Sequence, residues 1–236
     1  VISAVNSGST PLTGVSITDD LGGYTFGSGT LYPLAYVDGS VRVYVNGVLQ
    51  TSSPTVVEGP PIVFSGLTVP ASGNLMLIYE ARVNQFAPLG ADDSIVNTAA
   101  VTASGITAPS TASATVTPDA SGALTITKSI DPVSVTENGT VTYTFIIQNY
   151  GSGAATAEDE VSVRDTFDPI LSDISVSLNE TALAVTEGYT YDQATGTFVT
   201  VPGVITVPAA TFVQDTATGA WTVTPGVTRL TVTGTL

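Results

Sequence analysis

Few side chains of this chain could do covalent chemistry, because its 236 residues include neither cysteine nor histidine. Thiol and imidazole groups supply the common nucleophiles, general bases and zinc ligands of proteins. Their absence excludes Ser/His/Asp and Cys/His mechanisms. What remains is a set of carboxylates and the amine of the single lysine, Lys128. We expect no enzymatic activity, no catalytic residue, no cofactor and no metal ion.

Three acidic clusters could ligate calcium or act as paired carboxylates in glycoside hydrolysis. They are Asp19-Asp20, Asp92-Asp93 and Glu158-Asp159-Glu160. Calcium loops usually place oxygen ligands at alternate positions with glycines at the turns, and none of these clusters has that spacing. Solvated loop acids are the favoured interpretation, and a hydrolase stays a remote alternative.

The chain is strongly acidic, since 20 acids outnumber five bases and give a formal net charge of -15. Such a surface repels phosphate backbones and anionic lipid headgroups, so we expect no nucleic acid partner. No apolar run approaches the roughly 20 residues of a membrane span, so we expect no membrane insertion. The chain starts with neither an initiator methionine nor a signal peptide, which indicates a mature or excised piece of a longer precursor.

The elements that would position these groups are β-strands. Threonine and valine are the commonest residues, and both favour the pleated conformation. Apolar residues alternate with polar ones in residues 41–45, 74–83, 141–147 and 230–236, a pattern typical of half-buried strands. Asn46-Gly47 predicts a tight hairpin, and the near copies 192–196 and 215–219 predict two further turns. The chain is predicted to be all-β, with helix limited to a turn or two.

One phrase occurs twice at an offset of about 143 residues, which favours two domains. Asn6-Ser7-Gly8 leads to Val15-Ser16-Ile17-Thr18-Asp19, and Asn149-Tyr150-Gly151 leads to Val161-Ser162-Val163-Arg164-Asp165. Turn and linker residues at 118–122 place the boundary near residue 120. The predicted domains are therefore residues 1–120 and 121–236.

These residues resemble a known family, the "conserved repeat" domain of unknown function found in bacterial and archaeal surface proteins. The similar segments are 124–128, 139–144, 149–151, 161–165, 219–223 and 232–236 in the second half, and 6–19, 75–83 and 94–99 in the first. The resemblance implies an immunoglobulin-like β-sandwich that builds surface stalks, cell-wall proteins and, in some clostridia, spore-appendage fibres. It implies no enzymatic activity.

Each repeat departs from the family pattern at one end. The first lacks opening strands corresponding to residues 124–145, and the second lacks a closing strand corresponding to residues 94–100. A sandwich without these strands leaves unpaired backbone groups and an open apolar groove. Two explanations stay open: the missing strands belong to residues outside this sequence, or a neighbouring subunit supplies them and drives head-to-tail polymerisation.

The single lysine has one further possible role. In surface pilin and adhesin domains, a buried strand lysine can attack an asparagine carboxamide while a protonated acid polarises the carbonyl, which gives an isopeptide bond. Lys128, Asp165 and an asparagine equivalent to Asn97 have the right order along such a domain, with Asp19 equivalent to Asp165. The alternative is a solvent-facing lysine that guards a strand edge.

The sequence therefore predicts a structural subunit of an extracellular fibre, appendage or surface layer that assembles by strand complementation. Its partners would be copies of itself, which contact one another through both chain ends, with possible cell-wall or glycan contact. The alternative is a stalk or ligand-binding segment of a cell-wall adhesin, with recognition in the loops 22–36 or 51–61.

Overall fold

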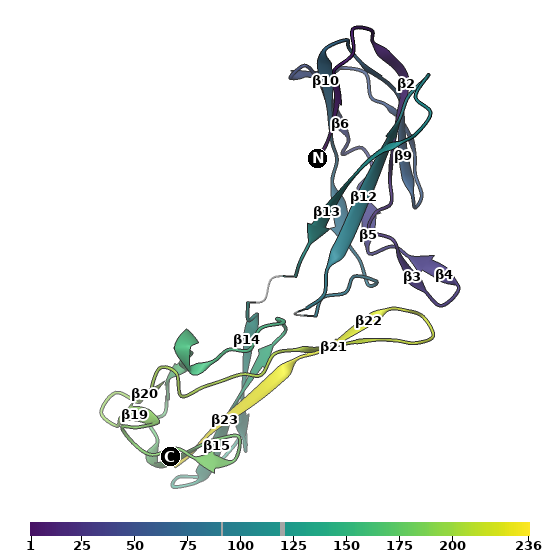
Figure 1. The fold of residues 1–236 in the computed structure, drawn as a ribbon. Helices are drawn as coiled ribbons and strands as arrows, with labels where there is room; N and C mark the ends of the chain where they lie inside the picture. Colours follow the sequence, from purple (N-terminus) through teal and green to yellow (C-terminus); the bar gives the residue numbers. More distant parts are fainter. Residues whose placement is uncertain (91, 119–120) are drawn as a thin grey trace. The chain divides into compact units, whose positions relative to one another are not determined.

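The structure is a computed structural model that describes residues 1–90, 92–118 and 121–236 (Figure 1). The described residues form β-strands and one 3-10 turn, Ala157–Asp159, which confirms the predicted all-β class. Two compact units are present: unit 1 is Val1–Thr117 with Gln214–Thr222, and unit 2 is Pro118–Val213 with Val223–Leu236. The centre of the predicted boundary, Asp119 and Ala120, lies outside the described residues.

Unit 1 contains two main antiparallel sheets. The first has the order β1 (Ile2–Asn6), β10 (Gly73–Ile78), β6 (Arg42–Val45), β7 (Val48–Leu49). The second has the order β13 (Ser110–Val116), β12 (Ile95–Thr102), β2 (Leu12–Asp19), β9 (Ile62–Val69), β8 (Thr55–Val57). Two short pairs join β3 (Tyr24–Phe26) to β4 (Gly29–Leu31), and β5 (Leu34–Tyr36) to β11 (Ala81–Val83).

Unit 2 is also built from two antiparallel sheets. The larger has the order β14 (Leu124–Asp131), β15 (Thr140–Asn149), β23 (Gly226–Thr235), β17 (Ser172–Leu178), β18 (Thr181–Ala182). The smaller has the order β16 (Arg164–Thr166), β20 (Thr197–Thr200), β19 (Tyr189–Asp192). A separate hairpin pairs β21 (Thr211–Gln214) with β22 (Trp221–Thr224), and its residues Gln214–Thr222 belong to unit 1.

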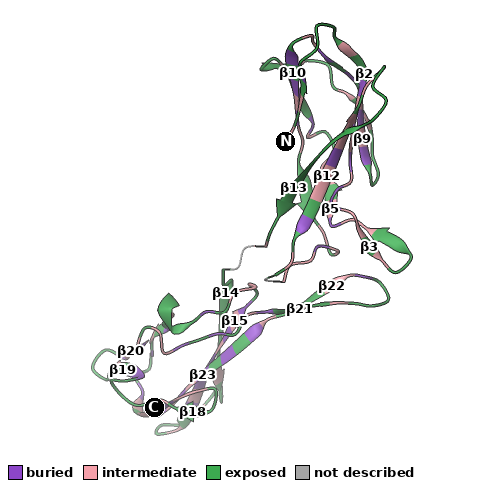
Figure 2. Cartoon of the chain, viewed as in Figure 1, coloured by how far each residue is buried: buried purple, intermediate pink, exposed green. Residues whose placement is uncertain are grey.

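Alternation of side chains along the strands builds the core of each unit. On β15, the buried apolar residues are Val141, Tyr143, Phe145 and Ile147, and the residues between them are more exposed (Figure 2). Successive strand residues point to opposite faces of a sheet, so these four side chains lie on one face. They belong to a cluster that also contains Phe198 of the smaller sheet. A core between two sheets fits a β-sandwich.

The core of unit 1 has the same construction. Phe64 of β9 and Leu77 of β10 are fully buried and lie in one apolar cluster, although the two strands belong to different sheets. The Phe64 ring contacts the rings of Tyr36 and Tyr79, with centroids 5.9 and 5.2 Å apart. Each unit therefore has a hydrophobic core of its own.

The predicted hairpins are present. Asn46 and Gly47 both have positive φ angles, of 50° and 80°, and join β6 to β7. Gly196 has φ 71° and its N–H donates to the carbonyl of Asp192 (2.8 Å), which closes the turn between β19 and β20. Positive φ is strained for most residues, so asparagine and glycine decide where these strands reverse.

Candidate functional site

Two buried asparagines mark equivalent places in the two units. Asn6 ends β1 and Asn149 ends β15. In each case Nδ2 donates to a carbonyl four residues further along, at 2.8 and 2.7 Å, and to a proline carbonyl, that of Pro70 or Pro208, at 2.9 and 3.1 Å. The asparagine that begins each copy of the repeated sequence therefore has the same structural role: its side chain holds a loop against the end of a strand.

The strands around these asparagines correspond as well. Asn6 pairs with Gly73 and Asn149 with Gly226, so β10 corresponds to β23. The order β1-β10-β6-β7 then matches β15-β23-β17-β18, and β2-β9-β8 matches β16-β20-β19. The main sheets differ at two places. Among the described residues, β14 has no counterpart in unit 1, and the pair β12 and β13 has none in unit 2.

In unit 1, the position that β14 occupies in unit 2 is open. Strand β1 is the edge strand of its sheet and pairs only with β10 among the described residues. An apolar groove runs beside it, lined by Ile2, Ala4, Leu12, Val15 and Val101, among others. An edge with unpaired backbone groups and an apolar groove is a template for another strand.

In unit 2, the position that β12 occupies in unit 1 is open. Strand β16 is an edge strand and pairs only with β20 among the residues described. The groove beside it is lined by Leu124 and Ile126 of β14, Ile147 of β15, and Val161 and Val163. Ile126 is 53% exposed, which is unusual for an isoleucine that faces a sheet interior. The open edge is therefore at β1 in unit 1 and at β16 in unit 2, which are not equivalent strands.

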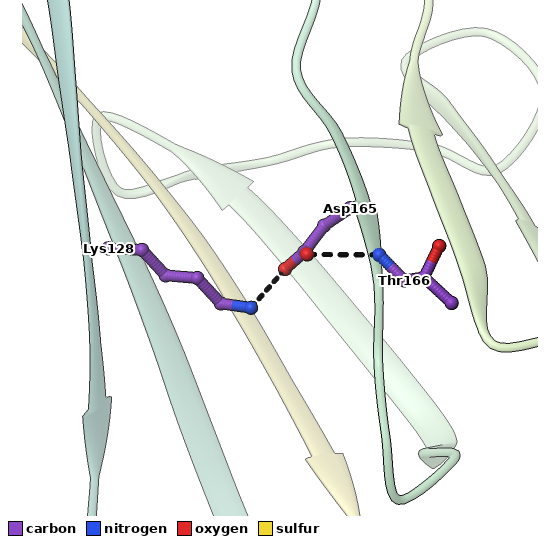
Figure 3. A network of polar contacts seen from close by, with 3 residues as sticks. All are labelled: Lys128, Asp165 and Thr166. Carbon is purple, nitrogen blue, oxygen red and sulfur yellow. Dashed lines mark hydrogen bonds and ion pairs between the residues drawn. The ribbon is translucent and has the colours of Figure 1, made fainter.

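Lys128 and Asp165 meet in unit 2 (Figure 3). The distance from Lys128 Nζ to Asp165 Oδ2 is 2.5 Å, and the side chains are 40% and 18% exposed. Asp165 Oδ1 accepts the backbone N–H of Thr166 at 2.9 Å. Among the described residues, the buried Oδ2 atom has no hydrogen-bond partner besides its contact with the amine. The carboxylate is therefore held by backbone on one side and by lysine on the other.

Aromatic rings surround the amine of Lys128. Its Nζ atom lies 4.7 Å from the ring centroid of Tyr143, 5.4 Å from that of Phe167 and 5.7 Å from that of Phe145. Ring faces attract a cation and exclude water. The Lys128 side chain therefore lies beside these rings, and it is also 40% exposed on the edge strand β14.

Asp19 and Asn97 meet in unit 1. Asp19 is buried, and its Oδ2 accepts a hydrogen bond from Asn97 Nδ2 at 3.0 Å, while Oδ1 accepts the N–H of Leu21 at 2.9 Å. Asn97 Oδ1 is buried and has no hydrogen-bond partner among the residues that the structure describes. An unpaired buried carbonyl oxygen is costly, because it has lost its water without gaining a donor.

Tyr79 is a third member of this cluster. Burial raises the pKa of its phenol above the ordinary value of 10.0, and the adjacent carboxylate of Asp19 raises it further. Sequence reasoning missed Tyr79, and likewise the rings of Tyr143 and Phe167. Tyr143 and Phe145 lie two residues apart in the predicted strand 141–147, so an aromatic face on that strand could be predicted. The contact of that face with Lys128 could not.

The four predicted side chains thus form two incomplete sites. Unit 2 brings together an amine and a carboxylate, and unit 1 brings together a carboxylate and a carboxamide. The carboxylates Asp165 and Asp19 are the equivalent members, since each ends the repeated phrase on an equivalent strand. Each site has two of the three groups that an isopeptide bond requires.

The acidic clusters are engaged in local structure. Asp159 accepts the backbone N–H of Thr156 (2.7 Å) and its hydroxyl (3.0 Å), and these bonds lower the pKa of Asp159. Asp93 accepts the N–H of Gly90 at 2.7 Å, and Asp20 accepts those of two other residues. No group of three or more acidic side chains within residues 1–90, 92–118 and 121–236 could hold a metal ion.

The two loops considered for ligand recognition differ in form. Within 22–36, strands β3 and β4 pair into a short hairpin. Within 51–61, Ser52, Ser53 and Pro54 line a shallow groove together with Val43 and Gln50. Among the described residues, no aromatic or acidic side chain lines that groove, so loop 51–61 lacks the groups that usually orient a sugar or peptide ligand. Within 22–36, by contrast, Tyr24 lines a pocket together with Pro33 and Ile95.

No family model matches this chain, and no curated protein and no solved structure matches it either. In the described part of the chain, no helix is long and apolar enough to cross a membrane. The function must therefore be inferred from the two open edges and the side chains beside them.

Proposed function

We propose that the chain is a structural subunit of an extracellular fibre or surface layer, made of two tandem immunoglobulin-like β-sandwiches. Each sandwich is completed by a strand from a neighbouring copy. The resemblance to surface-protein repeat domains supports the location, and the complementary open edges support the assembly. The observation that carries the proposal is that unit 1 is open where unit 2 has β14, and unit 2 is open where unit 1 has β12.

Strand addition is physically favoured at such edges. A strand entering beside β1 would pair with the edge that no described strand occupies, and would cover the groove lined by Ile2 and Ala4. Burial of apolar surface contributes about 25 cal/mol per Å2. A strand that fills the groove therefore gains backbone hydrogen bonds and the free energy of this burial. A strand of one copy that pairs with the open edge of another makes a contact between two different surfaces, and repetition of such a head-to-tail contact generates a linear polymer.

The test is assembly of purified chain, observed by electron microscopy and sedimentation velocity over a range of concentration and salt. We expect fibres or extended oligomers. Ala4→Lys places a charge in the groove beside β1 and should abolish them. Val48→Lys, at an exposed position of β7 in the same sheet that does not line this groove, is the control and should retain them. Dispersed monomers of the unmodified chain under every condition would contradict the proposal.

A further inference from the structure

The two incomplete sites have complementary groups, and their chemistry gains a purpose only if the proposed function, assembly by strand addition, holds. Unit 1 shows which strand covers the edge that is open in unit 2. Strand β12 pairs with β2 in a register that sets Ala99 opposite Asp19. Ile95, Asn97, Ala99 and Val101 alternate along β12, so they share one face, and on that face Ile95 and Ala99 are buried. Asn97 therefore points inward beside the carboxylate.

The same register can be transferred to unit 2. Asp165 takes the place of Asp19, and the residue two positions on, Leu21, is replaced by Phe167. Asn97 lies two positions before Ala99, so an equivalent asparagine would stand on the Phe167 side of Asp165. Lys128 Nζ is on that side, 2.5 Å from Asp165 Oδ2 and 5.4 Å from the Phe167 ring centroid. The entering carboxamide and the waiting amine would then share one pocket.

We propose that unit 2 is a covalent docking site, in which Lys128 forms an amide bond with an asparagine of the strand that completes the sheet beside β16. The occupant is an extended strand with the pattern of β12, which carries small or apolar residues at alternate positions and one asparagine among them. The groove beside β16 is lined by apolar side chains, and Lys128, the single lysine of the chain, contacts Asp165 of β16.

The reaction balances without any other reagent. The Lys128 ammonium passes a proton to Asp165, and the neutral amine attacks Cγ of the asparagine, so that the Nζ–Cγ bond forms. The Cγ–Nδ2 bond breaks. The leaving nitrogen takes one proton from the attacking amine and one from Asp165, and departs as ammonium. A docked strand would cover the exposed part of Lys128 and exclude water, which lowers the cost of the first proton transfer.

Unit 1 shows how a carboxamide is held beside the equivalent carboxylate when no described residue supplies an amine to react with it. Its carboxamide is already oriented by Asp19, and Asn97 Oδ1 is buried without a hydrogen-bond partner in the described residues. Tyr79 contributes to the same cluster in place of an amine. A carboxamide held in this way in unit 2 would present its carbon to Lys128 once Asp165 carried the proton.

The experiment uses the full chain and a synthetic peptide with the sequence of residues 93–104, which supplies the strand without requiring β12 to leave unit 1. Peptide binding is followed by fluorescence anisotropy, and covalent addition by intact mass after denaturation. We expect an adduct with the summed mass less one ammonia, and tandem mass spectrometry should place the link between Lys128 and the peptide asparagine.

Matched variants separate docking from chemistry. Lys128→Arg keeps the positive charge beside Asp165 and should bind the peptide without forming an adduct. The peptide with Asn97→Ala should behave in the same way. The Asp165→Asn variant should bind the peptide but form the adduct at least about 10²-fold more slowly, which is the usual contribution of a positioned proton-transfer group. Denaturation-resistant ladders of the chain alone would identify a second copy as the donor.

The outcomes distinguish the two proposals. Binding of the unmodified peptide without any mass adduct overturns the covalent site and leaves strand complementation standing. An adduct that persists in Lys128→Arg overturns the assigned nucleophile. Absence of peptide binding overturns the covalent site and removes the support that the edge of β16 gives to the proposed assembly, which the fibre experiment then tests through β1 alone.

Discussion

The two units are built on one strand plan and differ at opposite edges. In the described part of unit 1, β2 pairs with β12, and β1 has a strand on one side only; in that of unit 2, β15 pairs with β14, and β16 has a strand on one side only. Each unit therefore displays the strand that the other is missing. Comparison of the units shows what a completed version of either would contain, including the side chains that an added strand would bring to Asp19 or Asp165.

The clearest sign of this difference lies at the paired asparagines. Asn149 Oδ1 accepts two backbone N–H groups, those of Gly151 and Ala123, each at 2.9 Å. Ala123 directly precedes β14. Asn6 Oδ1 accepts the N–H of Gly8 at 3.0 Å, and no opening strand supplies a second donor in the described residues. One acceptor position in unit 1 is thus left for a donor from another strand.

The largest effect should come from the cores, and it tests whether the units fold independently. Phe64 and Phe198 are both fully buried. Replacement of either by alanine should lower the free energy of unfolding of its own unit by about 3–5 kcal/mol, because a cavity remains. Calorimetry should resolve one shifted transition for each variant. Equal shifts of both transitions would show a single cooperative block, and Val133→Ala, at an exposed position, is the control.

A smaller effect should separate the two asparagines. Asn6→Ala and Asn149→Ala should each destabilise their unit by about 2–4 kcal/mol, because several buried hydrogen bonds are lost. Each side chain makes four hydrogen bonds, but the bond from Asn6 to the carbonyl of Val69 is long, at 3.4 Å, whereas Asn149 accepts the N–H of Ala123 at 2.9 Å. The loss at Asn149 should therefore be the greater by less than about 1 kcal/mol. Urea denaturation provides the measurement. Equal losses would mean that the opening strand of unit 2 contributes nothing at this position.

The smallest effect is a pH dependence at Tyr79. Its pKa in the folded state lies above 10.0, so its stabilising contribution is complete below that pH and is lost as the pH rises through the ordinary tyrosine range. Unit 1 should therefore lose stability between about pH 8 and about pH 11, and Tyr79→Phe should lose less. In unit 2, burial alone raises the pKa of Tyr189, so its alkaline loss should be smaller.

Denaturation at the two pH values checks this prediction. Tyr150→Phe, at an exposed position in unit 2, is the matched control and should leave the alkaline loss of unit 1 unchanged. If Tyr79→Phe loses as much stability as the unmodified chain, the phenol is not responsible and the cluster with Asp19 has another source of pH sensitivity.

Much of the local structure was predictable from sequence because it depends on neighbours along the chain. Alternation gave residues 141–147 as a strand, and positive φ at Asn46 and Gly47 placed a hairpin. Prediction was weaker where strands are interrupted. Residues 74–83 alternate throughout, but the structure divides them into β10 and β11, and Val83 is exposed. Period two alone does not reveal where a strand leaves its sheet.

The candidate site was predictable in its members and not in its surroundings. Repeat alignment grouped Lys128 with Asp165, and Asn97 with Asp19, and the structure places the members of each pair in contact. The rings around the amine and the phenol beside Asp19 come from strands distant in sequence. Such contacts depend on strand order and on the packing of two sheets, which alternation does not specify.

By itself, the sequence determined the all-β class, the twofold repeat, the turns and the absence of histidine and cysteine chemistry. These follow from residue type and short spacing, since backbone preference and side-chain alternation act locally. Tertiary structure alone decided which edges are bare, and that the amine, the carboxylates and the carboxamide are divided into two incomplete sites. The reason is that sheet order and the approach of opposite faces are set by burial of apolar surface across the whole unit.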